Sequence, residues 1–173
     1  MGKRGKFEKP IPRKKGRGIL LILLLLLLLG AVLLTIRLTG GARIARELEK
    51  QVDPEAADWS VPQLADESSG GKGIQIPGYG SIPIPTGSDT VNLVLLNPEG
   101  NPCYFTFALV LSSTGECLYE SGLVPPGQAI SQVTLSRVLD PGEYEATIRI
   151  TTTSLADGSA MNGAEVETVL IVQ

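Results

Sequence analysis

An uninterrupted apolar run near the start of the chain limits what this sequence can fold into. Gly18 to Ile36 is 19 residues long, has no charged side chain and contains 11 leucines. As a helix rising about 1.5 Å per residue it would span roughly 28 Å, close to the roughly 30 Å hydrocarbon core of a bilayer. The run also lacks the polar face that a helix on a soluble core would carry. The sequence therefore predicts a transmembrane helix over residues 18–38, bracketed by Arg17 and Arg37, whose side chains can reach the two interfaces.

Charge is distributed unevenly on the two sides of this run. Residues 1–17 contain eight basic residues and one acidic residue, whereas residues 37–50 contain four basic and two acidic residues. Because basic segments stay on the cytoplasmic side, we expect a single pass through the cell membrane, with the N-terminus in the cytoplasm and the C-terminal part outside. A cleavable signal peptide is the alternative, although its apolar region is usually about 7–15 residues long.

The basic tail, residues 1–17, has two other interpretations. It could bind nucleic acid or the anionic surface of the lipid bilayer. No nucleic-acid-binding motif accompanies the charge, so we expect no nucleic-acid partner. The tail is interpreted as a cytoplasmic topology signal that also contacts the bilayer.

The segment after the apolar run, residues 39–73, changes in character. Gly40 and Gly41 are expected to interrupt the helix, and a short juxtamembrane helix is predicted from Ala42 to Gln51. From Asp53 onward the sequence is poor in apolar residues and contains Pro, Gly and Ser, which is typical of disorder. The sequence therefore predicts a juxtamembrane helix followed by a flexible stalk.

Residues 74–173 show apolar alternation of period two, interrupted by Gly, Pro and Asn turns. The pattern predicts seven or eight strands, at 74–76, 82–84, 91–95, 103–111, 117–120, 129–135, 143–152 and 165–172. Within about 100 residues this is typical of an all-β fold, an immunoglobulin-like antiparallel sandwich of two sheets. Prolines at 77, 83 and 85 place the first two segments at a sheet edge. We expect an extracytoplasmic β-sandwich domain over residues 74–173.

One turn motif carries a family resemblance. Leu-Asp-Pro-Gly-Glu-Tyr at residues 139–144 resembles the approach to the penultimate strand in bacterial Ig-like and fibronectin-type sandwiches. The layout is similar to that of small single-pass, membrane-anchored surface proteins of Gram-positive bacteria. The resemblance implies that Pro141 and Gly142 form the turn. It also implies that Tyr144 packs at the sheet corner, with its hydroxyl bonded to nearby backbone.

Candidate catalytic and metal-binding groups are few. The absence of histidine excludes Ser-His-Asp and Cys-His catalysis and any His-ligated zinc site, and two cysteines are too few for an all-cysteine zinc site. Two pairs of glutamates, at 143/145 and 165/167, are interpreted as the solvated face of strands. The loop at residues 157–163 lacks the spacing of a calcium loop. We expect no enzyme activity, no catalytic residue, no cofactor and no metal.

The two cysteines are expected to remain apart. A two-residue turn at Thr114 and Gly115 would place Cys117 opposite Ser112, roughly 30 Å along the strand from Cys103. A disulfide needs Cα atoms within about 7 Å of each other. An intrachain bond stays open as an alternative, but Cys103 is expected to be a small buried apolar side chain.

The leading functional hypothesis is a membrane-tethered binding or structural module with an unknown protein partner in the envelope, such as an accessory of an envelope, surface or transfer machine. The rival hypothesis is a regulator that presents a loop, such as a protease inhibitor, and an envelope enzyme is third. Two loops, residues 121–128 and 154–164, are the candidate contacts. The candidate interaction residues in them are Leu123, Pro125, Pro126, Asp157 and Asn162.

Overall fold

The computed structural model describes residues 15–60 and 73–173, and no side chain is described at 15–20 or 36–39. The chain divides into two compact units, Met1–Gly40 and Gly41–Gln173. The first unit contains most of helix α1 (Lys15–Glu49). Arg17 and Arg37, the predicted flanks of the membrane span, fall within α1, but their side chains lie outside the described part.

Helix α1 is long and apolar enough to cross a membrane. Its part from Leu21 to Glu49 has a mean hydropathy of 2.8 in its apolar window, and none of that window is buried. A signal sequence near the N-terminus has the same properties. The helix continues through Gly40 and Gly41, so the predicted interruption is wrong. Each glycine costs a helix only about 1 kcal/mol relative to alanine, and a helix that has already formed adds one hydrogen bond for each residue that extends it.

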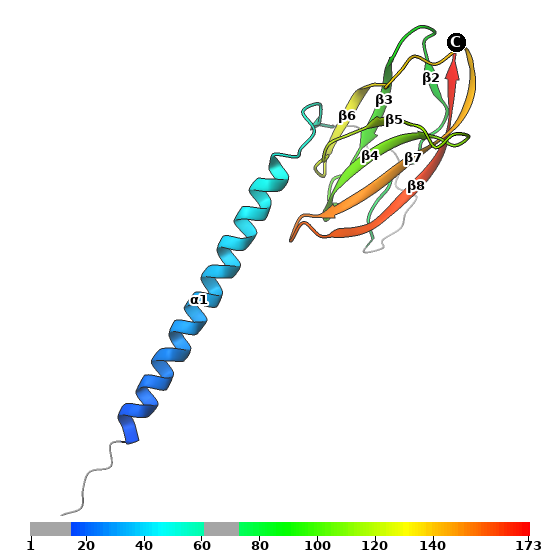
Figure 1. Cartoon of the computed structure of the whole chain (residues 1–173). Coiled ribbons are helices and arrows are strands. Elements are labelled where there is room, and N and C mark those ends of the chain that lie inside the picture. Colours follow the sequence, from blue (N-terminus) through cyan, green and yellow to red (C-terminus); the bar gives the residue numbers. More distant parts are fainter. Residues whose placement is uncertain (1–14, 61–72) are drawn as a thin grey trace, which may run out of the picture. The chain divides into compact units, whose positions relative to one another are not determined.

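The described residues of the second unit form eight strands in two sheets (Figure 1). The five-stranded sheet has the order β2-β8-β7-β4-β5, and the three-stranded sheet has the order β1-β6-β3. The strands are β1 (Ala57–Asp58), β2 (Ile82–Ile84), β3 (Thr90–Leu96), β4 (Cys103–Leu111), β5 (Cys117–Glu120), β6 (Gln128–Thr134), β7 (Gly142–Ser154) and β8 (Ala160–Val172).

The two sheets share one hydrophobic core. Apolar side chains alternate into it from β3 and β6 of one sheet and from β4, β7 and β8 of the other. Phe105 and Phe107 are both fully buried, with their ring centroids 5.8 Å apart in an edge-to-face arrangement. Further core members include Leu95, Leu109, Ile130, Ile148, Ile150 and Leu170. The predicted alternation of β4 and β7 is therefore the pattern that fills the core.

Several strands differ from the predicted ones. No strand forms at residues 74–76, and β2 pairs with β8 in parallel, so the larger sheet is not wholly antiparallel. The edge position of β2 is confirmed, and Pro83 is exposed there, where a missing N–H costs no sheet hydrogen bond. Strands β7 and β8 extend further toward each other than expected, and only residues 155–159 lie between them.

The turn between β4 and β5 is longer than two residues. Leu111 N–H donates to the Glu116 carbonyl at 2.9 Å, and Cys117 pairs with Val110, so the predicted pairing of Cys117 with Ser112 is wrong. A register shift in this ladder accounts for the difference. Both cysteines are free thiols, with Cys103 fully buried and Cys117 exposed.

Residues Gln51–Trp59, here named the strap, are bound to the β domain instead of forming a free stalk. Leu123 N–H donates to the Gln51 carbonyl at 2.9 Å, and Asp53 N–H donates to the Leu123 carbonyl at 2.8 Å. Strand β1 pairs with the start of β6, and Trp59 N–H donates to the Gly127 carbonyl at 3.0 Å. The predicted disorder is therefore wrong for residues 53–60. The rest of the predicted stalk, 61–72, lies outside the described residues.

Candidate functional site

A buried carboxylate fixes the strap. Asp53 is 8% exposed, and its carboxylate accepts the Gly122 N–H at 2.7 Å and the Glu55 N–H at 2.9 Å. A Cβ atom at Gly122 would lie 2.9 Å from the Asp53 Cα and 2.9 Å from the Gln51 carbonyl oxygen. The strap therefore approaches so closely that only glycine fits at position 122.

The strap covers the first of the two predicted interaction loops. Leu123 is 7% exposed, and Pro125 and Pro126 are partly buried. The backbone of this loop is bonded to the strap at Leu123 and at Gly127. The strap thus covers Leu123, which is not a free surface for a partner, whereas Pro125 and Pro126 stay partly exposed.

The second predicted loop is a tight turn between two long strands. Asp157 is exposed, and its carboxylate accepts the Ser159 hydroxyl at 2.7 Å and the Ser159 N–H at 3.1 Å, which together lower the pKa of Asp157. Asn162 lies within β8 and does not belong to a loop, because the β7–β8 ladder continues beyond the predicted strand ends. The end of α1 packs against this turn: Leu48 is 8% exposed, and a Cβ at Gly158 would lie 3.2 Å from the Ile44 side chain.

The corner motif has a scaffold geometry. The Tyr144 hydroxyl donates to the Asp140 carbonyl at 2.9 Å, and its ring is half-buried against the core. Gly142 begins β7 with a backbone φ of 151°, an angle that L-residues with a side chain rarely adopt. Pro141 is exposed directly before it. These three residues fix the start of β7.

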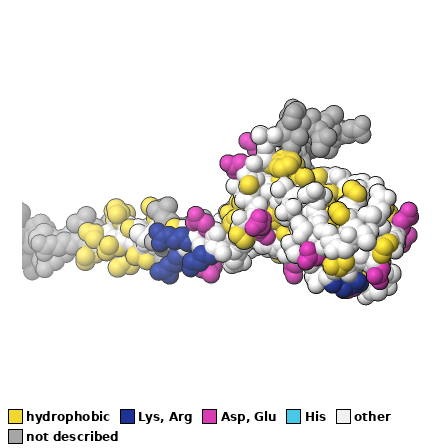
Figure 2. Space-filling view, turned by 90° about the horizontal axis from the view of Figure 1, so that it is seen from above, with side chains coloured by type: hydrophobic (Ala, Val, Ile, Leu, Met, Phe, Trp, Pro, Cys, Tyr) yellow, Lys and Arg dark blue, Asp and Glu magenta, His cyan; other side chains and the backbone are white. Residues whose placement is uncertain are grey.

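The β domain is strongly acidic. Residues 73–173 contain ten acidic residues and two arginines, and both arginines are paired. Arg137 binds both carboxylate oxygens of Glu116 at 2.8 and 2.9 Å, which lowers the pKa of Glu116, and Arg149 binds Glu165 at 2.9 Å. Acidic side chains are scattered over the face of the domain in Figure 2, where basic ones are few. The surface therefore favours a cationic partner.

The acidic groups do not form a metal site in the described part of the chain. There, no three His, Cys, Asp or Glu side chains converge as metal ligands would. Glu143 and Glu145 are exposed on β7, and Glu165 and Glu167 are exposed on β8. Of these four carboxylates, that of Glu165 is paired with Arg149 at 2.9 Å.

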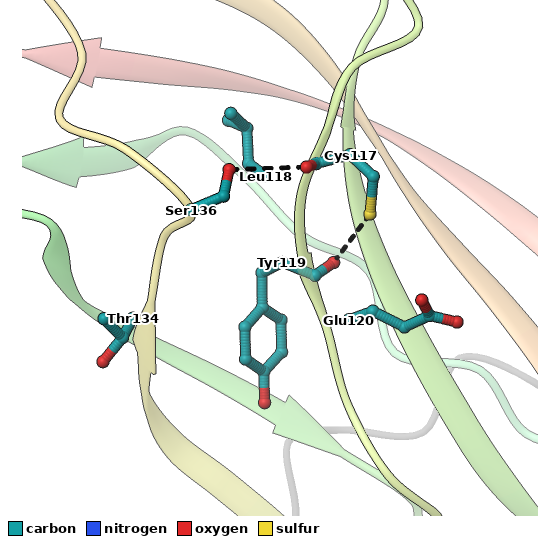
Figure 3. A pocket seen from close by; sticks show the side chains of 6 residues that line it. All are labelled: Cys117, Leu118, Tyr119, Glu120, Thr134 and Ser136. Carbon is teal, nitrogen blue, oxygen red and sulfur yellow. Dashed lines mark hydrogen bonds between the residues drawn. The ribbon is translucent and has the colours of Figure 1, made fainter.

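A shallow, open groove of about 400 Å³ lies beside β5 (Figure 3). Strand β5 is the last strand of its sheet, and Ser136, which follows β6, closes one wall by donating its N–H to the Leu118 carbonyl at 2.7 Å. The Tyr119 side chain lies between β5 and the segment that carries Thr134. The groove, here named the β5 groove, is lined by Cys117, Leu118, Tyr119, Glu120, Thr134 and Ser136.

The β5 groove has a negative field. Burial, and then the negative charges of Asp53 and Glu55, raise the pKa of Tyr119 to about 12. Tyr119 therefore keeps its hydroxyl proton at neutral pH and can donate a hydrogen bond. The two carboxylates belong to the strap, so the strap contributes to the field of the groove beside it.

The sequence did not reveal the β5 groove as a site. The strand at 117–120 was predicted, but its position at an open edge depends on strand order, which alternation does not encode. Asp53 was assigned to a stalk because a buried aspartate and a solvated one look alike in sequence. The available signal is the Asp53-Pro54 pair, which is typical of a turn. In such turns the aspartate carboxylate commonly accepts the backbone N–H two residues ahead, as Asp53 does here with Glu55.

Comparisons of the chain with protein-family models, with curated proteins and with solved structures returned no match.

Proposed function

We propose that this protein is a single-pass membrane protein that displays an immunoglobulin-like β-sandwich outside the cytoplasm as a binding module. The observation that carries the proposal is the junction after α1. The candidate membrane helix ends at Glu49, and the chain enters the strap, which is bonded to the β domain, at Gln51. Such a junction suits a protein that holds a folded surface near a membrane.

The strand order supports the immunoglobulin-like assignment. In that fold, strands B and E share one sheet, and strands G, F, C and C′ follow one another in the other. Here β3 and β6 are neighbours, and β8, β7, β4 and β5 follow one another in the other sheet. Tyr144 lies near the start of β7, which corresponds to strand F and is where sandwiches of this class place a corner tyrosine. Ala146 stands where antibody domains have their second cysteine.

The proposed orientation rests on charge. Residues 1–17 carry most of the basic residues near the apolar helix, and basic segments are retained in the cytoplasm. The domain beyond α1 would then lie outside, in the cell membrane's outer aqueous space. Its negative charge accords with this, because acidic domains are not held back by the positive-inside rule.

A binding role is favoured over catalysis because the features that the structure offers are surfaces. The β5 groove is open, acidic and bordered by an unpaired strand edge, and we propose it as the binding site. The inhibitor hypothesis has less support, because the strap covers the loop around Leu123 that an inhibitor would present.

Three measurements test the proposal, the first on isolated membranes and the other two on whole cells. Carbonate should leave the protein in the membrane fraction, and external protease should digest the β domain. A photo-reactive amino acid placed in turn at exposed positions of the β domain should then yield protein adducts from at least one position. Release by carbonate, protection of the domain, or an absence of adducts at every position would each contradict the proposal.

A further inference from the structure

We infer that the open edge of β5 binds an extended, basic segment of a partner protein as an added strand. This inference rests on the proposed function, because it names the partner chemistry of the β5 groove. In such recognition, main-chain hydrogen bonds provide affinity and alternate side chains provide specificity.

The ladder between β4 and β5 shows which backbone groups face outward. Ser121 N–H donates to the Phe107 carbonyl at 2.9 Å, so this pair is hydrogen-bonded. Antiparallel pairs alternate between bonded and non-bonded types, and the next pair is Ala108 with Glu120. The N–H and carbonyl of Glu120 therefore point away from β4 and toward the open edge.

The strap shows how this edge accepts a strand. Val52 bridges Leu123 in parallel, three positions beyond Glu120. The edge is thus completed by an extended segment at one end. Toward its other end, the Leu118 carbonyl accepts the Ser136 N–H at 2.7 Å, so the outward backbone groups of Glu120 are the open part of the edge in the described chain. Nearby, β1 covers only the first two residues of β6, so the side of β6 from Ile130 onward has no strand partner in the described part of the chain. An added segment would lie end to end with the strap.

Charge selects the partner. Glu120 is exposed at the open edge, and Asp53 and Glu55 add to the negative field there. Pairing of two copies of this chain along β5 would bring like charges together, which destabilises cross-strand neighbours. A basic segment would instead be attracted by the carboxylates of Glu120, Asp53 and Glu55. The observations therefore favour a different, cationic chain over self-association.

The side chains of the edge set a pattern for the added strand. Tyr119 packs against the core from the groove side, whereas Glu120 is exposed. Successive residues of a strand point to opposite faces, so the partner should alternate too. Apolar, β-branched side chains would cover Tyr119 on one face, and lysine or arginine would face Glu120 on the other.

A peptide-binding experiment on the full chain in detergent micelles tests the charge argument. The probe is a fluorescent peptide of about eight residues, alternating lysine and valine, which is long enough to cover the edge. We expect saturable binding that weakens with added salt, at least about tenfold weaker for Glu120→Lys, or about 1.4 kcal/mol. The matched control is Glu145→Lys, the same charge change on the exposed face of β7, which should alter affinity less than about twofold. Equal weakening by both substitutions would overturn the inference, because it would mean a general charge effect.

The backbone argument has its own test. The same peptide with alternate backbone amides methylated keeps its charge but cannot pair as a strand, and we expect its binding to be lost. In the unmodified protein, hydrogen exchange at the Glu120 amide should slow when the lysine–valine peptide is added. Equal binding of the methylated peptide, or unchanged exchange at Glu120, would overturn strand addition without depending on any substituted protein.

The crosslinking scan separates this inference from the proposed function. Adducts from position 120 or 117 that disappear when excess lysine–valine peptide is added would support both. Adducts only from positions outside the β5 groove would preserve a binding function for the β domain but overturn both the assignment of that function to the β5 groove and this inference. An absence of adducts anywhere would overturn both.

Discussion

The carboxylate of Asp53 and the backbone amide of Gly122, 69 residues apart in sequence, are joined by a hydrogen bond of 2.7 Å. This bond holds the segment after α1 on the β domain. Composition alone assigned the same segment to a disordered stalk.

Replacing Asp53 with alanine should release the strap. The change would leave the Gly122 and Glu55 amides without their acceptor, and an unsatisfied buried donor costs about 1–3 kcal/mol. We expect faster hydrogen exchange at Ala57 and Asp58 and a lower urea midpoint. Glu55→Ala, at an exposed side chain, should stay within about 0.5 kcal/mol of the parent. Equal exchange in both variants would contradict the role of Asp53.

Gly122→Ala should displace the strap by steric means alone. The new Cβ would meet two backbone atoms at 2.9 Å, and backbone cannot move aside as a flexible side chain can. Overpacking of this kind typically costs about 1–3 kcal/mol. Gly78→Ala is a matched control, because a Cβ there meets nothing within 4 Å. Thermal unfolding of both variants, with exchange measured at β1, checks the prediction, and an unchanged midpoint for Gly122→Ala would refute it.

Two tyrosines should respond oppositely to loss of their hydroxyl. Tyr144→Phe removes the bond to the Asp140 carbonyl and should cost about 1 kcal/mol. The buried Tyr79 hydroxyl has no hydrogen-bond partner in the described part, so Tyr79→Phe should be neutral or stabilising. Burial raises the pKa of the Tyr79 hydroxyl, and the nearby backbone of Leu96 lowers this pKa only in part. The contact between that backbone and the hydroxyl does not have hydrogen-bond geometry. Urea melts decide the matter, and a larger loss for Tyr79→Phe would contradict it.

The two thiols should differ in their reactivity and in how well the fold tolerates their replacement. Cys103 is fully buried, which raises its pKa, so it should resist iodoacetamide in the folded protein, whereas the exposed Cys117 should react. Cys103→Ser should destabilise the domain by about 1–3 kcal/mol through burial of a hydroxyl, and Cys117→Ser should change stability by no more than about 0.5 kcal/mol. Mass spectrometry of labelled protein provides the measurement. Faster labelling of Cys103 than of Cys117 would contradict the burial of the start of β4 in the core.

Alkaline pH should weaken the fold through Tyr119. Its pKa is raised from 10.0 to about 12 in the folded state, so the folded protein holds this proton more tightly than the unfolded chain. The resulting stability is complete below pH 10 and is lost as the pH rises toward 12. Tyr119→Phe should therefore show a shallower loss of stability across this interval in urea melts. An identical pH profile for the two proteins would show that Tyr119 is more solvated than the structure indicates.

Strands with strong alternation were predictable from sequence, and pairings between distant segments were not. Strands β4 and β5 have the predicted bounds, because apolar residues at every second position have one stable arrangement on a sheet covering a core. The parallel pairing of β2 with β8 is specified by backbone contacts between residues nearly 90 positions apart, which leave no local periodicity. The same reason explains why the strap was missed, since it binds mainly through main-chain groups.

The candidate site was the least predictable part. Loops rich in proline and glycine were expected to present contacts, but at Leu123 the chain covers its own loop. The β5 groove arises where one sheet ends and the strap stops short, and both facts depend on strand order. Glu120 looks like any solvated glutamate until its strand is known to pair, within the described residues, with β4 alone.

The strap also determines how a pulling force would travel through the molecule. Tension along α1 first reaches the packing of Leu48 against the turn at Gly158. It then reaches the hydrogen bonds of Gln51 and Asp53 with Leu123. If these bonds gave way, residues 51–59 would become free chain, adding up to about 30 Å at roughly 3.3 Å per residue. Loss of the strap would also remove the carboxylates of Asp53 and Glu55 from beside Tyr119. Mechanical load on α1 would thus both lengthen the chain between α1 and the β domain and weaken the proposed attraction of the β5 groove for a cationic partner.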